Sequence, residues 1–390
     1  MDSNKTQLLL LVCFLATLTQ AGISFYLPSL PEISQAFSSK TFASSTLSAY
    51  LFGYAAPMLF WGYLTEKLGP KYTLLTLTLL FAISSAILSI SPAKILFILS
   101  RCIQGACSGG CIIIGRSLLK NYYSGPQLAK VMSIISIAFV CSTAFYQILG
   151  GYISYHFSWH IIFLMMSILG LWGTIFTFLT LPAATQRKQT LSLFRSCQAY
   201  QSLITNRRFL LMLISGGTGS AIIMVFNTVS PFIFRHIFNF STIEYGYISL
   251  FIVLPYLFGS IINIKLSTSD KMYDIAKFGQ YAIITSGIIL LIASIFNSLT
   301  AYLLLSTFSV TIFGISLIYP NVISLAVTNA KEEASFAFSL FGFFQQITAF
   351  SLSLIAAIFV NEARQALITC ILFIGLISLA SFIYVAKKIN

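Results

Sequence analysis

The run YTLLTLTLLFAISSAILSIS occupies residues 72–91 and holds no charged residue. At the helical rise, 20 residues span about 30 Å, which is the thickness of the hydrocarbon core of a bilayer. Lipid offers backbone amides no partner, so such a run crosses a membrane as a helix that satisfies them internally. This stretch by itself therefore indicates a membrane-spanning helix.

The rest of the chain repeats this pattern. Of the 390 residues, 57% are hydrophobic and only 8% are charged, whereas a soluble domain carries about 25% charged residues. The apolar runs are long and unbroken, unlike the alternating segments of about ten residues in a membrane β-barrel. We predict an all-α membrane protein with twelve transmembrane helices, at residues 6–27, 42–63, 72–91, 94–120, 128–153, 158–181, 208–235, 242–266, 274–296, 299–327, 334–360 and 364–386.

The longest connection, residues 182–207, divides the chain into two halves. We expect an N-terminal six-helix bundle at 1–181, a cytoplasmic linker at 182–207 and a C-terminal six-helix bundle at 208–390. The halves echo each other weakly, since FSSKT at 37–41 and FNFST at 238–242 hold matching places in the helix order. Two pseudo-symmetric bundles with a site between them are typical of transporters.

Lysine and arginine predict the orientation. If both termini are cytoplasmic, seventeen of the 22 Lys and Arg residues fall on the cytoplasmic side, four fall on the other side, and Arg101 lies inside a span. We therefore expect a multi-pass protein of a bacterial-type inner membrane with cytoplasmic N- and C-termini. The first run, Leu8–Tyr26, lacks a small-residue cleavage site, so we expect it to be a retained span and not a signal peptide.

Several other classes of protein are disfavoured. The net charge of +13 is scattered over short loops, so no nucleic-acid surface is expected. The seven cysteines and three histidines lack metal-ligand spacing. No nucleophile grouping or phosphate-cradling glycine loop is visible, which disfavours an enzyme and an ATP-driven pump. We expect no cofactor and no metal.

Short motifs occur at defined places in this helix order. They are YLPSLP at 26–31 after span one, GYLTEKLGPK at 62–71 between spans two and three, RCIQG at 101–105 in span four, GRSLLKN at 115–121 at its end, and LGG at 149–151 followed by SWHIIF at 158–163. Together they resemble the major facilitator superfamily, and within it the Bcr/CflA drug-resistance branch of drug:proton antiporters. The resemblance covers the N-terminal half closely and the C-terminal half mainly by helix count.

The resemblance implies a cytoplasmic gate at the loop between spans two and three. In the family, an acid of this loop latches to the other half of the protein. Here Glu66 replaces the usual Asp and Pro70 the usual Arg, so we expect an altered latch. The expected gate residues are Gly62, Glu66, Lys67, Gly69, Lys71 and Arg116.

Arg101 is the most informative candidate for a substrate site. It lies about 10 Å into span four, where a charge is costly and faces a cavity or a partner, unless it snorkels to the outer interface or bonds backbone carbonyls of span one. Other polar residues within spans line a cavity or hold helices together. The substrate-cavity candidates are Tyr26, Arg101, Gln104, Ser108, Tyr146, Gln147, Asn227, Tyr319, Asn321, Gln345 and Gln346.

None of the nine acidic residues lies in the middle of a predicted span. Proton-coupled exporters commonly use a buried carboxylate. The resembling branch often carries an Asp where this chain has Ser24, and a proline near the place of Gln147. Both departures weigh against drug:proton antiport. Glu32, just past span one, is the nearest remaining candidate for a proton site, and a solvated acid at a helix end is the alternative.

These observations favour a secondary active transporter that exports a small molecule, either a drug-like amphiphile or a metabolite, by alternating access and with protons as coupling ion. The alternative is a facilitator or importer of an anionic metabolite or siderophore without a buried proton site. The expected partners are the substrate and the bilayer, with the protein acting as a monomer.

Overall fold

A computed structural model describes residues 3–58, 60–90, 93–120, 125–182, 201–266, 271–330 and 334–386. Every regular element in these ranges is a helix, with no strand among them. They form two compact units, the first made of Met1–Gln189 with Phe240–Ser249 and the second of Thr190–Asn239 with Leu250–Asn390. The predicted linker 182–207 lies largely outside the described residues.

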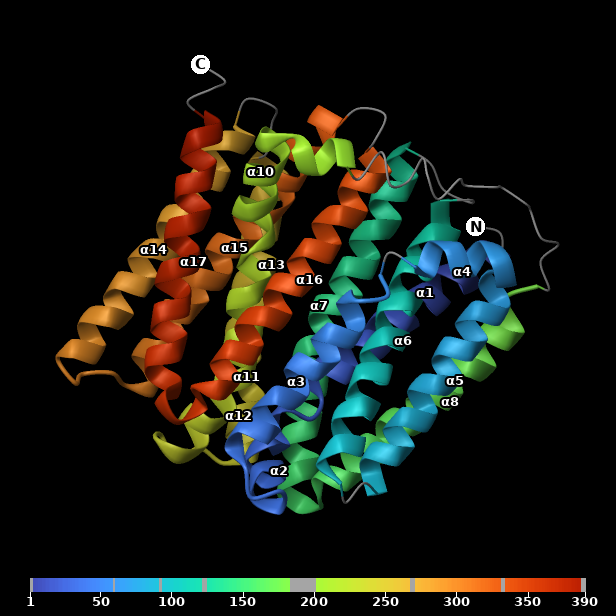
Figure 1. Cartoon of the computed structure of the whole chain (residues 1–390), viewed down its shortest axis with the longest axis horizontal. Coiled ribbons are helices and arrows are strands. Elements are labelled where there is room, and N and C mark those ends of the chain that lie inside the picture. Colours follow the sequence, from blue (N-terminus) through green and yellow to red (C-terminus); the bar gives the residue numbers. More distant parts are fainter. Residues whose placement is uncertain are drawn as a thin grey trace. The chain divides into compact units, whose positions relative to one another are not determined.

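The first unit contains nine α-helices and one short 3-10 turn within the described ranges (Figure 1). They are α1 Ser3–Ser24, η1 Leu27–Ser29, α2 Leu30–Ala36, α3 Lys40–Ala55, α4 Trp61–Leu68, α5 Pro70–Ile90, α6 Lys94–Lys120, α7 Gly125–His156, α8 Trp159–Thr180 and α12 Thr242–Tyr247. Helix α5 packs along α8, α3 along α6, and α1 against both α6 and α7. The short helices α2 and α4 lie at opposite ends of this unit.

The second unit is also built from helices within the described ranges. They are α10 Arg207–Gly217, α11 Gly219–His236, α13 Leu250–Leu266, α14 Met272–Ile295, α15 Ala301–Ala330, α16 Ala334–Ile358, η3 Val360–Glu362 and α17 Ala363–Ala386. Helix α15 packs on α14 and α13, α16 packs on α11, and α17 packs on α14 and α10. Pro231, Pro255 and Pro320 lie inside α11, α13 and α15.

Eleven helical segments of the described chain are long and apolar enough to cross a membrane, against twelve in our prediction. The difference falls on the predicted span 42–63. Helix α3 ends at Ala55 after 16 residues, because Pro57 has no amide hydrogen to continue the helical ladder. The chain then turns, with the Met58 amide bonded to the Ala55 carbonyl at 3.0 Å, and resumes as α4.

The turn between α4 and α5 depends on one glycine. Gly69 follows α4 with φ +80°, a conformation that costs glycine little and other residues more. Pro70 then begins α5, where its missing N–H is not needed. The predicted loop motif at 62–71 is thus mostly helix, with a tight turn at one residue.

Glycines also set the distance between α3 and α6. A Cβ atom at Gly53 would overlap the Cys102 carbonyl oxygen, and one at Gly105 would overlap the Tyr50 carbonyl oxygen. The two backbones therefore touch, an approach that only small residues permit. This contact places the start of α6 directly against α3, next to Arg101.

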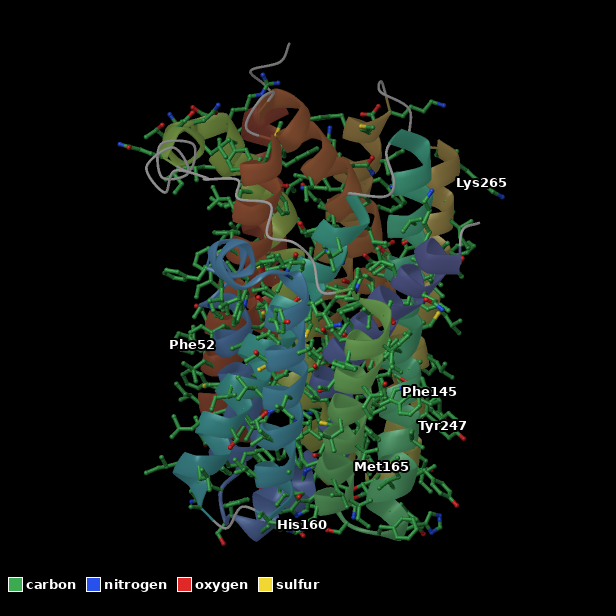
Figure 2. All side chains as sticks on the ribbon, turned by 90° about the vertical axis from the view of Figure 1, so that its right-hand side faces the viewer. Phe52, Phe145, His160, Met165, Tyr247 and Lys265 are labelled. Atoms are coloured by element: carbon green, nitrogen blue, oxygen red, sulfur yellow. The ribbon has the colours of Figure 1, made fainter. Side chains whose placement is uncertain are left out.

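Apolar side chains also cover the outside of the helices. Phe52 and Phe145, labelled in Figure 2, are exposed large hydrophobic residues on α3 and α7. A soluble protein rarely exposes contiguous apolar surface. With the long apolar helices, these side chains fit a protein whose surface faces lipid.

Candidate functional site

Arg101 lies in the interior of the first unit and is fully buried. Its Nε donates to the Thr46 carbonyl oxygen of α3 at 3.3 Å. Its Nη1 donates to Oε1 of Gln104, one turn further along α6. The guanidinium therefore does not snorkel to an interface. It bonds a backbone carbonyl, although of the second predicted span and not of the first.

Two tyrosine rings pack against this guanidinium. The Arg101 Cζ atom lies 4.2 Å from the ring centre of Tyr26 and 4.7 Å from that of Tyr50. The Tyr26 hydroxyl lies 3.2 Å from Thr46 Oγ1, and the Tyr50 hydroxyl donates to the Thr19 carbonyl at 2.9 Å. Tyrosine faces attract a cation through the ring quadrupole. The rings thus hold the charge in place without cancelling it.

Gln104 extends the cluster to two further helices. Its Nε2 donates to Ser85 Oγ of α5 at 2.7 Å and lies 3.6 Å from the Met166 sulfur of α8. Ser108 Oγ donates to the Gln104 carbonyl at 2.9 Å. Four predicted site residues, Tyr26, Arg101, Gln104 and Ser108, therefore belong to one buried network inside the first unit.

This network leaves part of the Arg101 charge unpaired. The Nη2 atom is buried and has no hydrogen-bond partner among the described residues. No carboxylate of the described chain pairs with the guanidinium, whose contacts are neutral. Arg101 is also the one charged side chain classed as buried in the described part of the protein. An uncompensated buried charge is costly, so its retention points to a role.

A second polar cluster joins α1 and α7 in the same unit. Gln20 Nε2 donates to Ser24 Oγ and to Thr143 Oγ1, both at 2.8 Å, while Gln20 Oε1 is buried without a partner in the described chain. We did not single out Gln20 from the sequence. The signal that could have identified it is its polar amide side chain within the uncharged apolar run at 8–26.

The predicted residues of α7 lie close to this cluster in the chain. Both side-chain amide atoms of Gln147 are buried and without a hydrogen-bond partner among the described residues. The Tyr146 ring packs on Phe25, with centroids 5.2 Å apart. Near Gln147, α7 and α12 lie in close contact, since a Cβ atom at Gly246 of α12 would lie 2.9 Å from the Gln147 carbonyl oxygen.

The predicted residues of the second unit lie on three helices, α11, α15 and α16. Asn321 Nδ2 donates to Asn263 Oδ1 at 2.6 Å, which ties α15 to α13. The Tyr319 ring meets Phe341 edge-on at 5.9 Å, and Asn227 is buried with its Oδ1 unpartnered in the described chain. Gln345 and Gln346 on α16 are half-buried. Gln280, which the sequence analysis did not select, donates to Ser215 Oγ at 2.7 Å.

The predicted gate residues are only partly described. The side chains of Glu66 and Lys67 lie outside the described residues, and Gly62 is placed on α4 by its backbone alone. Lys71 Nζ donates to the Phe178 carbonyl at 3.1 Å and lies over the Phe178 ring. Arg116 is exposed near the end of α6.

The acidic side chains that are described lie near helix ends. Glu32 is in α2, Glu244 caps α12, Asp274 begins α14, and Glu362 is in η3. Glu32 is half-buried and accepts a hydrogen bond from Ser154 Oγ at 2.7 Å. Within the described residues, no three His, Cys, Asp or Glu side chains are grouped so that they could hold a metal ion.

The long apolar helices define a multi-pass membrane protein. The sequence profile of the Major Facilitator Superfamily matches residues 12–353, and the chain belongs to that superfamily. It is therefore a transporter and not an enzyme.

Relatives and solved structures agree with this assignment. The chain is 26% identical to the bicyclomycin resistance protein homolog of Haemophilus influenzae over 68% of this chain and 69% of that one. It is 26% identical to the multidrug resistance protein MdtL of Escherichia coli O157:H7 over 96% and 95%. The crystal structure of a D-xylose-proton symporter superposes with a TM-score of 0.75 at 14% identity, covering 99% and 98%. That of the POT family transporter PepTSo gives 0.74 at 12%, covering 100% and 98%.

Proposed function

We propose that this protein exports a small molecule, a drug-like amphiphile or a metabolite, across the inner membrane by alternating access. The observation that carries the proposal is the similarity to relatives named for multidrug and bicyclomycin resistance, which extends over 96% of the chain for MdtL. In this mechanism the substrate site opens to one side of the membrane at a time. The excess of Lys and Arg in one set of loops supports cytoplasmic termini.

The eleven predicted cavity residues are the candidates for substrate contact. Tyr26, Arg101, Gln104 and Ser108 share one buried network, while Gln345 and Gln346 are half-buried on α16. Residues 62–71 with Arg116 form the proposed cytoplasmic gate, supported by the turn at Gly69. We propose that the halves of the transporter are the bundles 1–181 and 208–390 joined by the linker 182–207. The division of the chain into two compact units supports this, although Phe240–Ser249 groups with the first unit.

Export is tested by deleting the gene and measuring accumulation of fluorescent amphiphiles in the cell. Higher accumulation in the deletion strain, reversed by the wild-type gene, is expected. An Arg101→Ala protein that reaches the membrane at the wild-type level is the matched control. Unchanged accumulation of every compound contradicts export.

We further propose that protons drive this export and that Glu32 is the proton site. Its hydrogen bond to the buried Ser154 supports this role. A facilitator without proton coupling is the second candidate, favoured by the position of the described acids near helix ends and by Ser24, which accepts from a glutamine amide. Flux into proteoliposomes with and without a pH gradient decides between them, because a facilitator is insensitive to the gradient.

A further inference from the structure

We propose that Arg101 selects the cargo by charge, so that the transporter prefers anionic over neutral and cationic molecules. This inference rests on the proposed transport function and names the class of substrate. Arg101 acts here through its electric field as a specificity-determining residue. The field acts without direct contact to the cargo, because the Arg101 side chain is fully buried and contacts Thr46 and Tyr50 of α3, Gln104 of α6 and the Tyr26 ring.

The charge of Arg101 is permanent, and none of the groups that contact it in the described chain carries an opposite charge. An arginine stays protonated in proteins. Its neighbours are the Thr46 carbonyl, the Gln104 amide and two tyrosine rings, all neutral, and its Nη2 atom has no partner among the described residues. The field of this cation therefore reaches beyond its own cluster.

The polar groups of the adjoining helices do not cancel that field. On α1 and α7 they are amides and hydroxyls, namely Gln20, Ser24, Thr143 and Gln147. The acids of the described chain lie near helix ends, and the contacts of the Arg101 guanidinium in the described chain include none of them. Two of the amides, Gln20 and Gln147, also keep buried polar atoms without a partner in the described chain.

The size of the effect follows from Coulomb's law. A ligand charge about 10 Å from the guanidinium, at an effective dielectric constant of about 20, changes affinity on the order of tenfold. A carboxylate should therefore bind about tenfold more tightly than a neutral analogue, and a cation about tenfold more weakly. Charge selection by a single arginine is large enough to measure.

The test uses three probes with one aromatic body. 1-Naphthaleneacetate, 1-naphthaleneacetamide and 1-naphthylmethylamine carry a negative charge, no charge and a positive charge at neutral pH. Their binding to the purified full-length protein in uncharged detergent is measured by thermal shift and by competition. We expect the carboxylate to bind most tightly, the amide about tenfold more weakly, and the ammonium about tenfold more weakly again.

Variants separate the charge from the fold. Arg101→Gln should reduce the differences in affinity among the three probes, and Arg101→Lys should preserve them. Lys40→Gln removes the same charge from the exposed start of α3 and should leave the wild-type ranking. Ser24→Asp adds a carboxylate two residues before Tyr26, whose ring contacts the guanidinium. It should weaken the preference for the carboxylate, and it gives a test even if Arg101→Gln does not fold.

Several results overturn the proposal. They are a wild-type protein that binds the ammonium as well as the carboxylate, a carboxylate that does not bind, and a ranking that neither Arg101→Gln nor Ser24→Asp changes. The measurement needs no flux. A protein that prefers the carboxylate but exports nothing contradicts the proposed function and leaves charge selection standing.

Discussion

The two units pack helices in the same way but bury different chemistry. In the first unit, Gly53 and Gly105 bring α3 and α6 into backbone contact, and in the second, Gly279 and Gly314 do so for α14 and α15. Only the first unit buries a charged side chain, Arg101, among the described residues. The buried polar side chains of the second unit, such as Gln280 and Asn321, are neutral. The two units therefore share glycine-mediated helix packing, and the first differs from the second by the buried charge of Arg101.

The largest effect should come from the glycine contact of the first unit. Gly105→Ala places a methyl group onto the Tyr50 backbone carbonyl, and overpacking of this kind costs about 1–3 kcal/mol or more. We expect a clear loss of thermal stability in detergent. Gly219→Ala in the second unit meets only the Ile315 side chain at 3.3 Å and should change stability much less. Equal stability of the two variants would contradict the difference in contact.

The next effect should come from the buried charge. Arg101→Gln removes donors from the Thr46 carbonyl and the Gln104 side chain, and each unmade bond costs about 1–3 kcal/mol. We expect at least about a tenfold loss of flux per correctly inserted molecule. Gln280→Leu removes one neutral bond, to Ser215, and should reduce flux less. If Arg101→Gln only lowers insertion and leaves flux per molecule intact, Arg101 is structural.

A smaller effect, in the opposite direction, is expected at Gln147. Both of its amide atoms are buried without partners in the described chain, and burying an unbonded amide costs about 1–3 kcal/mol. Gln147→Met should therefore raise the melting temperature. Asn227→Leu in the second unit removes a single buried atom without a partner in the described chain, Oδ1, and should raise the melting temperature less. A melting temperature lowered by Gln147→Met would show that the amide is satisfied.

The smallest effect on stability is expected at Glu32. The property to measure there is the dependence of transport on the pH gradient. Glu32→Gln keeps the size of the side chain and can still accept from Ser154, so stability should change by less than about 1 kcal/mol. Flux should lose its dependence on the pH gradient. Glu362→Gln, at an exposed position of the second unit, is the matched control. If Glu32→Gln transport keeps the wild-type response to the gradient, Glu32 is not the proton site.

Much of the fold could be predicted from local sequence, and the exceptions have local causes. Uncharged runs of about 20 residues predict spans because lipid excludes unpaired amides. The predicted span 42–63 did not allow for Pro57, which ends α3 at Ala55. The prediction also ended the first span at residue 27, whereas a helical turn and α2 continue the chain to Ala36.

The candidate site was less predictable. Arg101, Gln104 and Ser108 could be placed on one helix face from their spacing, and they do share a network. Thr46, Ser85 and Met166 come from three other helices, and no local pattern marks them. Gln20 was overlooked because an uncharged amide hardly changes the hydropathy of its run.

The sequence by itself determined that this is an all-α membrane transporter of a known superfamily, because hydrophobicity and short motifs are local properties. Which groups from other helices contact the Arg101 guanidinium was decided by the tertiary structure alone. The partner Thr46 lies 55 residues away from Arg101 on another helix, and only helix packing brings the two together, whereas Gln104 lies one turn away on the same helix. The absence of a counter-charge in the described chain is likewise a property of that packing, because it depends on which side chains meet the guanidinium and not on which residues neighbour it in sequence.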